Sequence, residues 1–242
     1  MQPLLSLSGV TKKFGALTVA DNTTFDLAAG EALGIIGPNG AGKSTLFNLI
    51  GGALAPSAGT VQFDGRDITA LPAAGRCHLG IARSFQIPHP FIGMSVYENL
   101  LAAAQFGNAG FDDKKDACRD ILARTGLLPK ANRPAGSLTL LERKRLELAR
   151  ALATGPRLLL LDEIAGGLTE AECHLLVETI KGIHASGVSI IWIEHIVHAL
   201  LAVAERLIVI DFGKIVAQGA PRAVMAEPLV QEIYMGLSVE DT

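Results

Sequence analysis

The sequence predicts an α/β protein with a mostly parallel sheet covered by helices on both faces, an antiparallel β edge and an inserted helical subdomain. Nearly half of the 242 residues are apolar (49%), which is enough for a sizeable core. Short apolar runs at 32–36, 158–161, 188–193 and 206–211 alternate with helical patterns. Uninterrupted apolar strands between helices are typical of a parallel sheet that is buried on both faces.

The first third of the chain predicts the antiparallel edge and the entry to the core. Residues 4–10 alternate apolar and small polar side chains, as an edge strand does, and 19–27 is a second strand. Residues 60–63, followed by an Asp-Gly pair, predict a hairpin strand and its turn. Residues 32–36 are apolar throughout, so we expect a strand inside the parallel sheet.

A helical insertion follows Gln86. Helical patterns cover 95–124, with a break at 107–112, and 141–154, and Pro- and Gly-rich loops flank them. The predicted division is a core made of 1–86 and 155–242, with a helical subdomain at 87–154.

The last part of the chain returns to the core. Strands at 188–193 and 206–211 are separated by a helix predicted at 196–204. Another helix is predicted at 170–185, and a helical tail at 221–237. This alternation supports the parallel sheet.

A glycine-rich loop separates the strand at 32–36 from a helical run that begins at Leu46. In this context such a loop binds phosphate, because its backbone N–H groups point inward and the helix N-terminus adds partial positive charge. Lys43 is predicted to reach the β and γ phosphates of a nucleotide, and the Ser44 hydroxyl to ligate Mg²⁺. The predicted nucleotide-binding residues of the loop are Gly37, Pro38, Asn39, Gly40, Ala41, Gly42, Lys43, Ser44 and Thr45.

Two carboxylates end the apolar strand at 158–161. Asp162 is predicted to hold the Mg²⁺ shell opposite Ser44, and Glu163 to polarise the water that attacks the γ-phosphate. His195 ends another apolar strand, and ligands bind at the carboxyl ends of strands in an open α/β sheet. We therefore predict that His195 contacts the γ-phosphate and supports the water as a catalytic residue.

Two further residues each have a functional and a structural interpretation. Gln86 ends a short strand where the helical insertion begins, so it could touch Mg²⁺ or water and report the γ-phosphate to the insertion. It could equally be a polar loop residue. Phe14 could stack on adenine, or it could be a half-buried core aromatic.

Charge and cysteine content exclude several classes of protein. A net charge of -3 gives no case for binding nucleic acid. The three cysteines are widely spaced and form no Cys-x-x-Cys pair, so we expect reduced thiols without a disulfide or zinc site. The most apolar region, 188–212, carries charged residues, which argues against a membrane span. We expect action at a membrane only through a partner.

The order and spacing of these residues resemble those of ATP-binding-cassette ATPases over almost the whole chain. The residues that carry the resemblance are Phe14, 37–45, Gln86, Leu138–Glu142, 158–163 and His195. The chain is most similar to the ATPase subunits of branched-chain or hydrophobic amino-acid importers, and lipopolysaccharide-exporter ATPases share much of the pattern. The narrower resemblance rests on 82–86, 94–100, 145–150, 193–195 and 227–236.

The resemblance implies a RecA-like P-loop NTPase core with a helical lobe, ATP and Mg²⁺ as ligands, and hydrolysis coupled to transport. It also implies a second ATPase subunit, identical or different, so that two ATP molecules are sandwiched head to tail. Each ATP would lie between the phosphate loop of one subunit and the signature segment of the other. Thr139, in the signature segment, would offer its hydroxyl to the ATP bound by the partner subunit. Transmembrane permease subunits, contacted through the Gln86 loop and the helical lobe, and indirectly a substrate-binding protein, would complete the assembly at the cytoplasmic face of the membrane.

The signature segment departs from the family's L-S-G-G-Q pattern, since it reads Leu138-Thr-Leu-Leu-Glu142. Leu140 and Leu141 replace glycines that permit close backbone approach, so their side chains must turn away. Glu142 places negative charge near an anionic ligand. Our hypothesis is that the composite site using this segment is weakened, and that the site using Lys43 stays competent when another subunit supplies a better signature.

Two other classes of function agree less well with the sequence. A soluble ATP-driven switch acting on ribosomes or DNA shares the fold, but such relatives usually carry two cassettes or a long coiled-coil insertion. A small-molecule kinase or a GTPase is disfavoured, because the chain lacks an Asn-Lys-x-Asp motif. Glu163 and His195 also suit the activation of water better than transfer to an acceptor. Fold alone does not decide between these classes.

Overall fold

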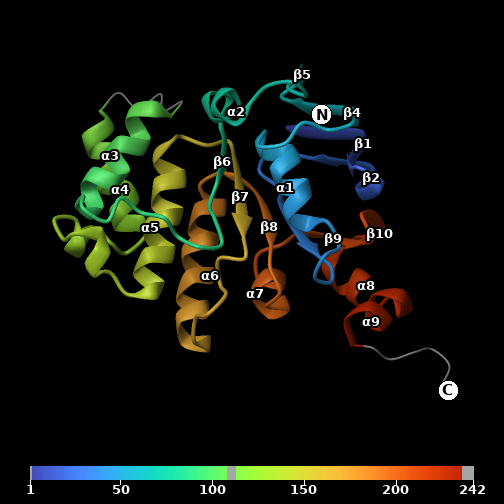
Figure 1. The fold of residues 1–242 in the computed structure, drawn as a ribbon. Helices are drawn as coiled ribbons and strands as arrows, with labels where there is room; N and C mark the ends of the chain where they lie inside the picture. The colour runs from blue at the N-terminus through green and yellow to red at the C-terminus, as the bar shows by residue number, and fades with distance from the viewer. Residues whose placement is uncertain (1, 108–112, 236–242) are drawn as a thin grey trace.

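Two sheets form the centre of the protein in a computed structural model that describes residues 2–107 and 113–235 (Figure 1). The larger sheet has the strand order β10-β9-β3-β8-β7-β6. Its strands are β3 (Ala32–Ile36), β6 (Ile81–Arg83), β7 (Leu158–Asp162), β8 (Ser189–Ile193), β9 (Arg206–Asp211) and β10 (Lys214–Gly219). All neighbours pair in parallel except β9 and β10, which are antiparallel.

The smaller sheet is antiparallel and has the order β2-β1-β4-β5. Its strands are β1 (Leu5–Phe14), β2 (Leu17–Leu27), β4 (Ala58–Phe63) and β5 (Arg66–Asp67). The predicted α/β class is therefore confirmed. The predicted antiparallel edge consists of this separate sheet and the β9–β10 hairpin.

Side-chain alternation along the central strands creates a core on each face of the large sheet. In β7, Leu159 and Leu161 belong to one hydrophobic cluster, and Leu158 and Leu160 belong to the other. Strand residues point alternately to opposite faces, so a fully apolar run supplies both clusters at once. This explains why these strands are continuous hydrophobic runs.

One helix lies between the sheets and the others cover the opposite face or extend from the sheet edge. Helix α1 (Lys43–Gly51) contributes Leu46, Phe47, Leu49 and Ile50 to the cluster shared with β1 and β2. Helices α3 (Val96–Phe106), α4 (Lys114–Arg124) and α5 (Leu140–Ala153) lie together beyond β6 (Figure 1). The remaining elements are α2 (Ala73–Leu79), η1 (Leu128–Lys130), η2 (Ala135–Ser137), α6 (Glu170–Ala185), α7 (Val197–Leu201), α8 (Pro221–Met225) and α9 (Pro228–Met235).

Two predicted helical segments differ from the structure by more than one residue or in their number of helices. The helix predicted at 196–204 ends at Leu201, because the chain turns there to enter β9. The predicted tail is two helices, since Pro228 disfavours helical backbone in the residue before it. Positions 236–237 of that tail, and most of the break predicted at 107–112, lie outside the described residues.

Candidate nucleotide-binding site

The glycine-rich loop joins β3 to α1 and packs against neighbouring backbone. A Cβ atom at Gly37 would lie 2.1 Å from the Ile210 carbonyl oxygen, and one at Gly42 would lie 2.4 Å from that of Val19. Gly42 is also the N-cap of α1, with a φ of 104° in the left-handed region. A side chain would clash with backbone at both positions, and at Gly42 it would also be strained by the left-handed backbone, which explains the glycines.

Lys43 is held inside this loop. Its side chain is buried, and Nζ donates hydrogen bonds to the carbonyl oxygens of Gly37 (2.6 Å) and Pro38 (2.9 Å). Burial lowers the pKa of Lys43, while the nearby charges of Glu163 and Asp162 raise it. The ammonium group therefore lies within the loop, close enough to Asp162 and Glu163 to feel the charge of both carboxylates.

A cavity of about 230 Å³ lies over the loop. It is lined by Val19, Asn39, Gly40, Ala41, Gly42, Lys43, Ser44, Thr45 and Glu163. The structure thus brings most of the predicted phosphate-binding residues and the predicted general base to one cavity. Val19, on β2, is an addition that no sequence motif marks.

Two neighbouring side chains contact the Glu163 carboxylate, one at each oxygen. The Gln86 side-chain amide donates a hydrogen bond to one carboxylate oxygen (2.5 Å), and Nε2 of His195 lies 2.5 Å from the other. The backbone of Glu163 is in the left-handed region, with a φ of 45°, and its N–H bonds to the Ile193 carbonyl. We call Glu163, Gln86 and His195 the Glu163 clasp. The three residues predicted as catalytic are therefore neighbours.

Strand register assembles this clasp. Gln86 follows β6, Glu163 follows β7 and His195 follows β8, and these strands are parallel neighbours. Because the carboxyl ends of parallel strands lie at the same edge of a sheet, three residues far apart in sequence meet there.

Asp162, predicted to hold the Mg²⁺ shell, has a partner that the sequence did not reveal. Arg83 Nη2 lies 2.5 Å from a carboxylate oxygen of this buried aspartate, and Nη1 donates to the Asn48 side chain at 2.6 Å. The Arg83 guanidinium also lies 5.6 Å and 5.2 Å from the ring centroids of Phe47 and Phe85. The ring contacts and the ion pair fix the arginine beside the aspartate.

Phe14 and Thr139 lie apart from this cluster. Phe14 ends β1 with its side chain 47% exposed, and Lys12 Nζ stands 5.2 Å from its ring centroid. Phe14 is thus about half exposed and belongs to neither hydrophobic cluster, and its stacking on adenine stays a prediction. Thr139 is the N-cap of α5 and accepts a hydrogen bond from the Glu142 N–H. Its predicted contact with ATP belongs to a partner's site, so it stays a prediction.

The signature segment is arranged around that cap. Leu141 turns into the core, whereas Leu140 remains 45% exposed and approaches Gly167. Glu142 forms an ion pair with Lys130, and its carboxylate also accepts a hydrogen bond from the Thr139 N–H. Partial burial opposes ionisation of Glu142, but the bonds from Lys130 and Thr139 prevail and lower its pKa. The negative charge expected near the ligand is compensated within the chain.

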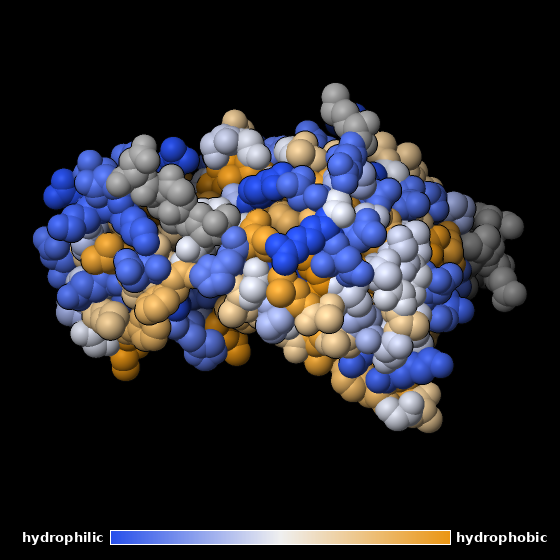
Figure 2. Space-filling model, turned by 90° about the horizontal axis from the view of Figure 1, so that it is seen from above, coloured by the Kyte–Doolittle hydropathy of each residue, from blue (hydrophilic) through white to orange (hydrophobic). Residues whose placement is uncertain are grey.

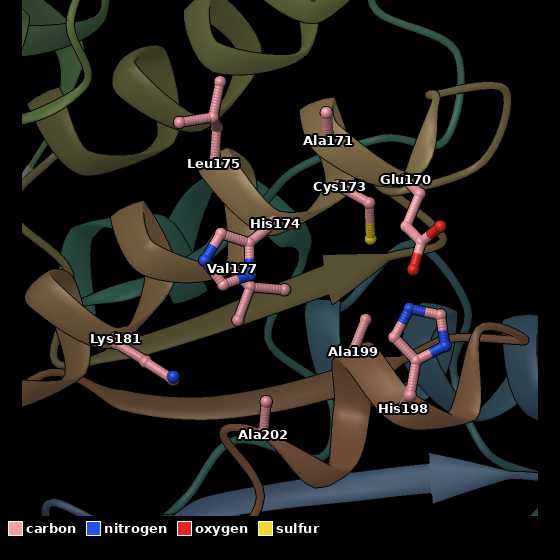
Figure 3. A pocket seen from close by; sticks show the side chains of 10 residues that line it. All are labelled: Glu170, Ala171, Cys173, His174, Leu175, Val177, Lys181, His198, Ala199 and Ala202. Atoms are coloured by element: carbon pink, nitrogen blue, oxygen red, sulfur yellow. The ribbon is translucent and has the colours of Figure 1, made fainter.

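A second cavity, of about 740 Å³, lies between α6 and α7 (Figure 3). Glu170, Cys173 and His198 border it, with His174 and Lys181 further along α6. None of the residues predicted for nucleotide binding or catalysis lines it. The predicted residues that line a cavity therefore lie at the smaller one, over the phosphate loop.

A parallel sheet, a glycine loop that leads into a helix and a clasped strand-end glutamate together define a phosphate-loop ATPase. Within the described residues, no helix is long and apolar enough to cross a membrane.

The family model described as ABC transporter matches residues 20–166, and the chain belongs to that family of ATPases. It is 34% identical to the high-affinity branched-chain amino acid transport ATP-binding protein LivG of Salmonella typhimurium, over 97% of this chain and 98% of that protein. The counterpart BraF of Pseudomonas aeruginosa is 32% identical over the same shares. The lipopolysaccharide export system ATP-binding protein LptB of Acidithiobacillus ferridurans is 31% identical over 98% of each chain.

Solved structures agree with this membership. An ATP-binding cassette of an ABC transporter in its ADP conformation superposes with a TM-score of 0.89 and 31% identity, over 98% of this chain and all (100%) of the other. A nucleotide-free cassette gives a TM-score of 0.87 at the same identity and coverage. The family predicted from the sequence is therefore confirmed.

Proposed function

We propose that this ABC-family ATPase powers the import of branched-chain or other hydrophobic amino acids through separate membrane subunits. The similarity to LivG and BraF over nearly the whole chain supports this substrate class. Lipopolysaccharide export is the second candidate, because LptB is 31% identical. The observation that carries the hydrolytic role is the Glu163 clasp beside the phosphate-loop cavity.

In this proposal the phosphate loop, residues 37–45, holds the triphosphate of ATP. Its backbone amides and the start of α1 face the phosphate oxygens, and the Lys43 ammonium moves from the loop carbonyls onto the β and γ phosphates. The Ser44 hydroxyl and the Asp162 carboxylate are oxygen donors of the kind that Mg²⁺ prefers, so these residues fit the metal. Bound there, Mg²⁺ would neutralise phosphate charge. Phe14 stacks on adenine.

Glu163 acts as the general base. Its carboxylate accepts a proton from water as the water oxygen bonds to the γ phosphorus, and the bond from that phosphorus to the ADP oxygen breaks. His195 and Gln86 already bond to the two carboxylate oxygens, so they fix the direction in which Glu163 faces the water. Gln86 also links this chemistry to the helical lobe.

The segment between β6 and α3 is the surface we propose for the permease subunits. Its exposed apolar side chains are Phe85, Ile87, Phe91, Ile92 and Met94. These five side chains lie within ten consecutive residues, 85–94. Figure 2, which shows the molecule from above, also has hydrophobic residues at the surface in the middle of the molecule. Exposed apolar groups that gather in this way mark interaction sites.

The assembly completes the site. Residues 87–154 act as a lobe beside the core of 1–86 and 155–242, and a second ATPase subunit, identical or different, closes against the phosphate loop with its own signature segment. Thr139 offers its hydroxyl to the ATP of that second subunit. The permease, fed by a substrate-binding protein, places the complex at the cytoplasmic face of the membrane. No role for nucleic acid is proposed.

Glu163→Gln tests the hydrolytic role. We expect ATP turnover to fall at least about 100-fold, the scale of general-base catalysis, with nucleotide affinity retained. The matched control is Glu172→Gln, which changes a partly exposed acid whose carboxylate accepts a hydrogen bond from the Thr169 N–H at the start of α6. Turnover in Glu163→Gln equal to that of the control would remove Glu163 from this role.

Co-expression with candidate permease subunits tests the substrate class. Uptake of a branched-chain amino acid into vesicles that contain the complex and enclose ATP supports import. ATP-dependent extraction of lipopolysaccharide, with no amino-acid uptake, would favour the exporter instead.

A further inference from the structure

Two buried charges lie behind the Glu163 clasp. Lys144, on α5 of the helical lobe, is 4% exposed, and Glu194, directly before His195, is 1% exposed. Neither follows from the phosphate-loop chemistry. Burying a lysine or a glutamate costs free energy unless each is hydrogen-bonded and faces opposite charge, so their presence needs a reason.

Lys144 reaches from the helical lobe to the backbone of two clasp residues. Its Nζ donates a hydrogen bond to the Gln86 carbonyl at 3.0 Å and lies 3.5 Å from the Glu163 carbonyl. One ammonium group therefore connects α5 to the loop after β6 and to the end of β7. Any shift of α5 would therefore change the distances from Lys144 Nζ to the carbonyl oxygens of Gln86 and Glu163.

Glu194 performs the corresponding task with backbone N–H groups. One carboxylate oxygen accepts from the Ala165 N–H at 3.1 Å, and the other accepts from the His195 N–H at 3.1 Å. It thereby joins the loop that follows Glu163 to the loop that carries His195. A carboxylate can accept at both oxygens, whereas an amide at this position would turn a donor toward one of the two N–H groups.

Burial is the largest electrostatic influence on both groups. Burial lowers the pKa of Lys144, and Glu194 is the leading charge that raises it, ahead of Glu163. Burial raises the pKa of Glu194, and hydrogen bonds from the N–H groups of Ala165, His195 and Ile196 lower it. For both groups burial prevails, so the pKa of Lys144 stays lowered and the pKa of Glu194 stays raised, and the hydrogen bonds and nearby charges offset only part of the cost of burial.

We propose that Lys144 and Glu194 are a pair of positioning residues, which together hold the backbones of Gln86, Glu163 and His195 so that the clasp forms only when α5 is in place. The proposal rests on the proposed function of the clasp. It assigns to Lys144 the coupling of the helical lobe to hydrolysis, and to Glu194 the alignment of the loops bearing Glu163 and His195. An apolar residue at either position would fill the core without aligning the clasp.

The test compares Lys144→Met, Lys144→Arg and Glu194→Gln in the full chain, with ATP turnover measured across ATP concentrations. We expect kcat to fall at least tenfold in Lys144→Met and Glu194→Gln, with less than a threefold change in KM, because the phosphate loop is untouched. Lys144→Arg keeps a cation and should recover most of the loss. Since the two residues act as one unit, the double variant should be no more than about twofold worse than the worse single variant.

Arg76→Met is the matched control for stability. Arg76 is another buried cation, 1% exposed. Among the described residues its hydrogen bonds go to carbonyl oxygens near the end of α1 and before α2, including those of Leu49 and Leu71. Its loss should lower the melting temperature as much as Lys144→Met does and leave kcat within twofold. An equal fall of kcat in Arg76→Met would show a general effect of stability and overturn the proposal.

A second readout needs no nucleotide. The ring signal of His195 in an NMR spectrum should shift in Lys144→Met and Glu194→Gln, because Glu163 no longer faces Nε2 in the same way, while Arg76→Met leaves it unchanged. An unmoved His195 signal together with wild-type kcat in Glu194→Gln would overturn the proposal. Wild-type turnover that survives Glu163→Gln would instead count against the proposed function.

Discussion

The N-termini of helices α1 and α5 differ in whether a side chain caps their free N–H groups, although both helices begin in segments predicted to contact ATP. Gly42 caps α1 without a side-chain hydrogen bond, so the first turn keeps its N–H groups for a ligand. Thr139 caps α5 through a complete capping box with Glu142, and Lys130 neutralises that glutamate. No side chain caps the start of α1, where we propose that phosphate binds, whereas the chain's own side chains satisfy the start of α5.

Replacing Lys43 by alanine gives the largest expected effect and tests the open helix start. Removing a charge that bonds to phosphate costs about 3 to 4 kcal/mol, so ATP affinity should fall about 100- to 1,000-fold by calorimetry. Thr139→Ala is the control, because its contact is predicted for another subunit's nucleotide. If both variants bind ATP equally in the single chain, the two helix starts do not differ as described.

Leu140→Ala and Leu141→Ala sharpen the comparison at the closed helix start. Leu141 is 8% exposed and Leu140 is 45% exposed. We expect Leu141→Ala to cost about 2 to 3 kcal/mol of unfolding free energy and Leu140→Ala less than about 1 kcal/mol in denaturant titrations.

The same pair tests the weakened signature. Only Leu140→Ala should raise ATP turnover of the purified protein alone, because it trims a side chain on the surface that a partner approaches. Brisk turnover of the unaltered protein without any other subunit would refute the weakened site.

Thr139→Ala measures how far α5 depends on its own cap. Loss of an N-cap hydroxyl costs about 1 kcal/mol, and Thr139→Ser should restore it. Unfolding in urea, followed by circular dichroism, is the measurement. A loss of stability in the serine variant equal to that in alanine would mean that the hydroxyl does not act as the cap.

The smallest expected effect is on the stability of the protein at acidic pH. The pKa of Glu142 is lower in the folded chain, so its contribution is present above the ordinary glutamate pKa and is lost as pH falls through the folded value. Between pH 5 and pH 3 the wild type should therefore lose more stability than Glu142→Gln, by less than about 1 kcal/mol. Parallel pH profiles of unfolding would contradict the pairing with Lys130.

Local sequence patterns were enough to predict the fold class and many residues of the candidate site. Fully apolar strands such as 158–161 indicated a doubly covered sheet, and each residue of the Glu163 clasp stood at the end of a predicted strand. The residues that were missed have side chains whose partners lie far along the chain: Arg83 meets Asp162, and Lys144 meets Gln86. No local periodicity records such pairings. A lysine within a basic helical run looks the same whether it faces solvent or the core.

The geometry of the Glu163 clasp also depends on the register between β6, β7 and β8. Arg83 lies opposite Leu160 on the next strand, and Asp162 lies opposite Ile193, which sets the heights at which the three strands end. Deleting a single residue within β7 would send every later side chain of that strand to the opposite face. Glu163 would then point away from both partners although no clasp residue had been altered. Length changes are therefore prohibited in the central strands of this protein, even at positions far from the clasp residues.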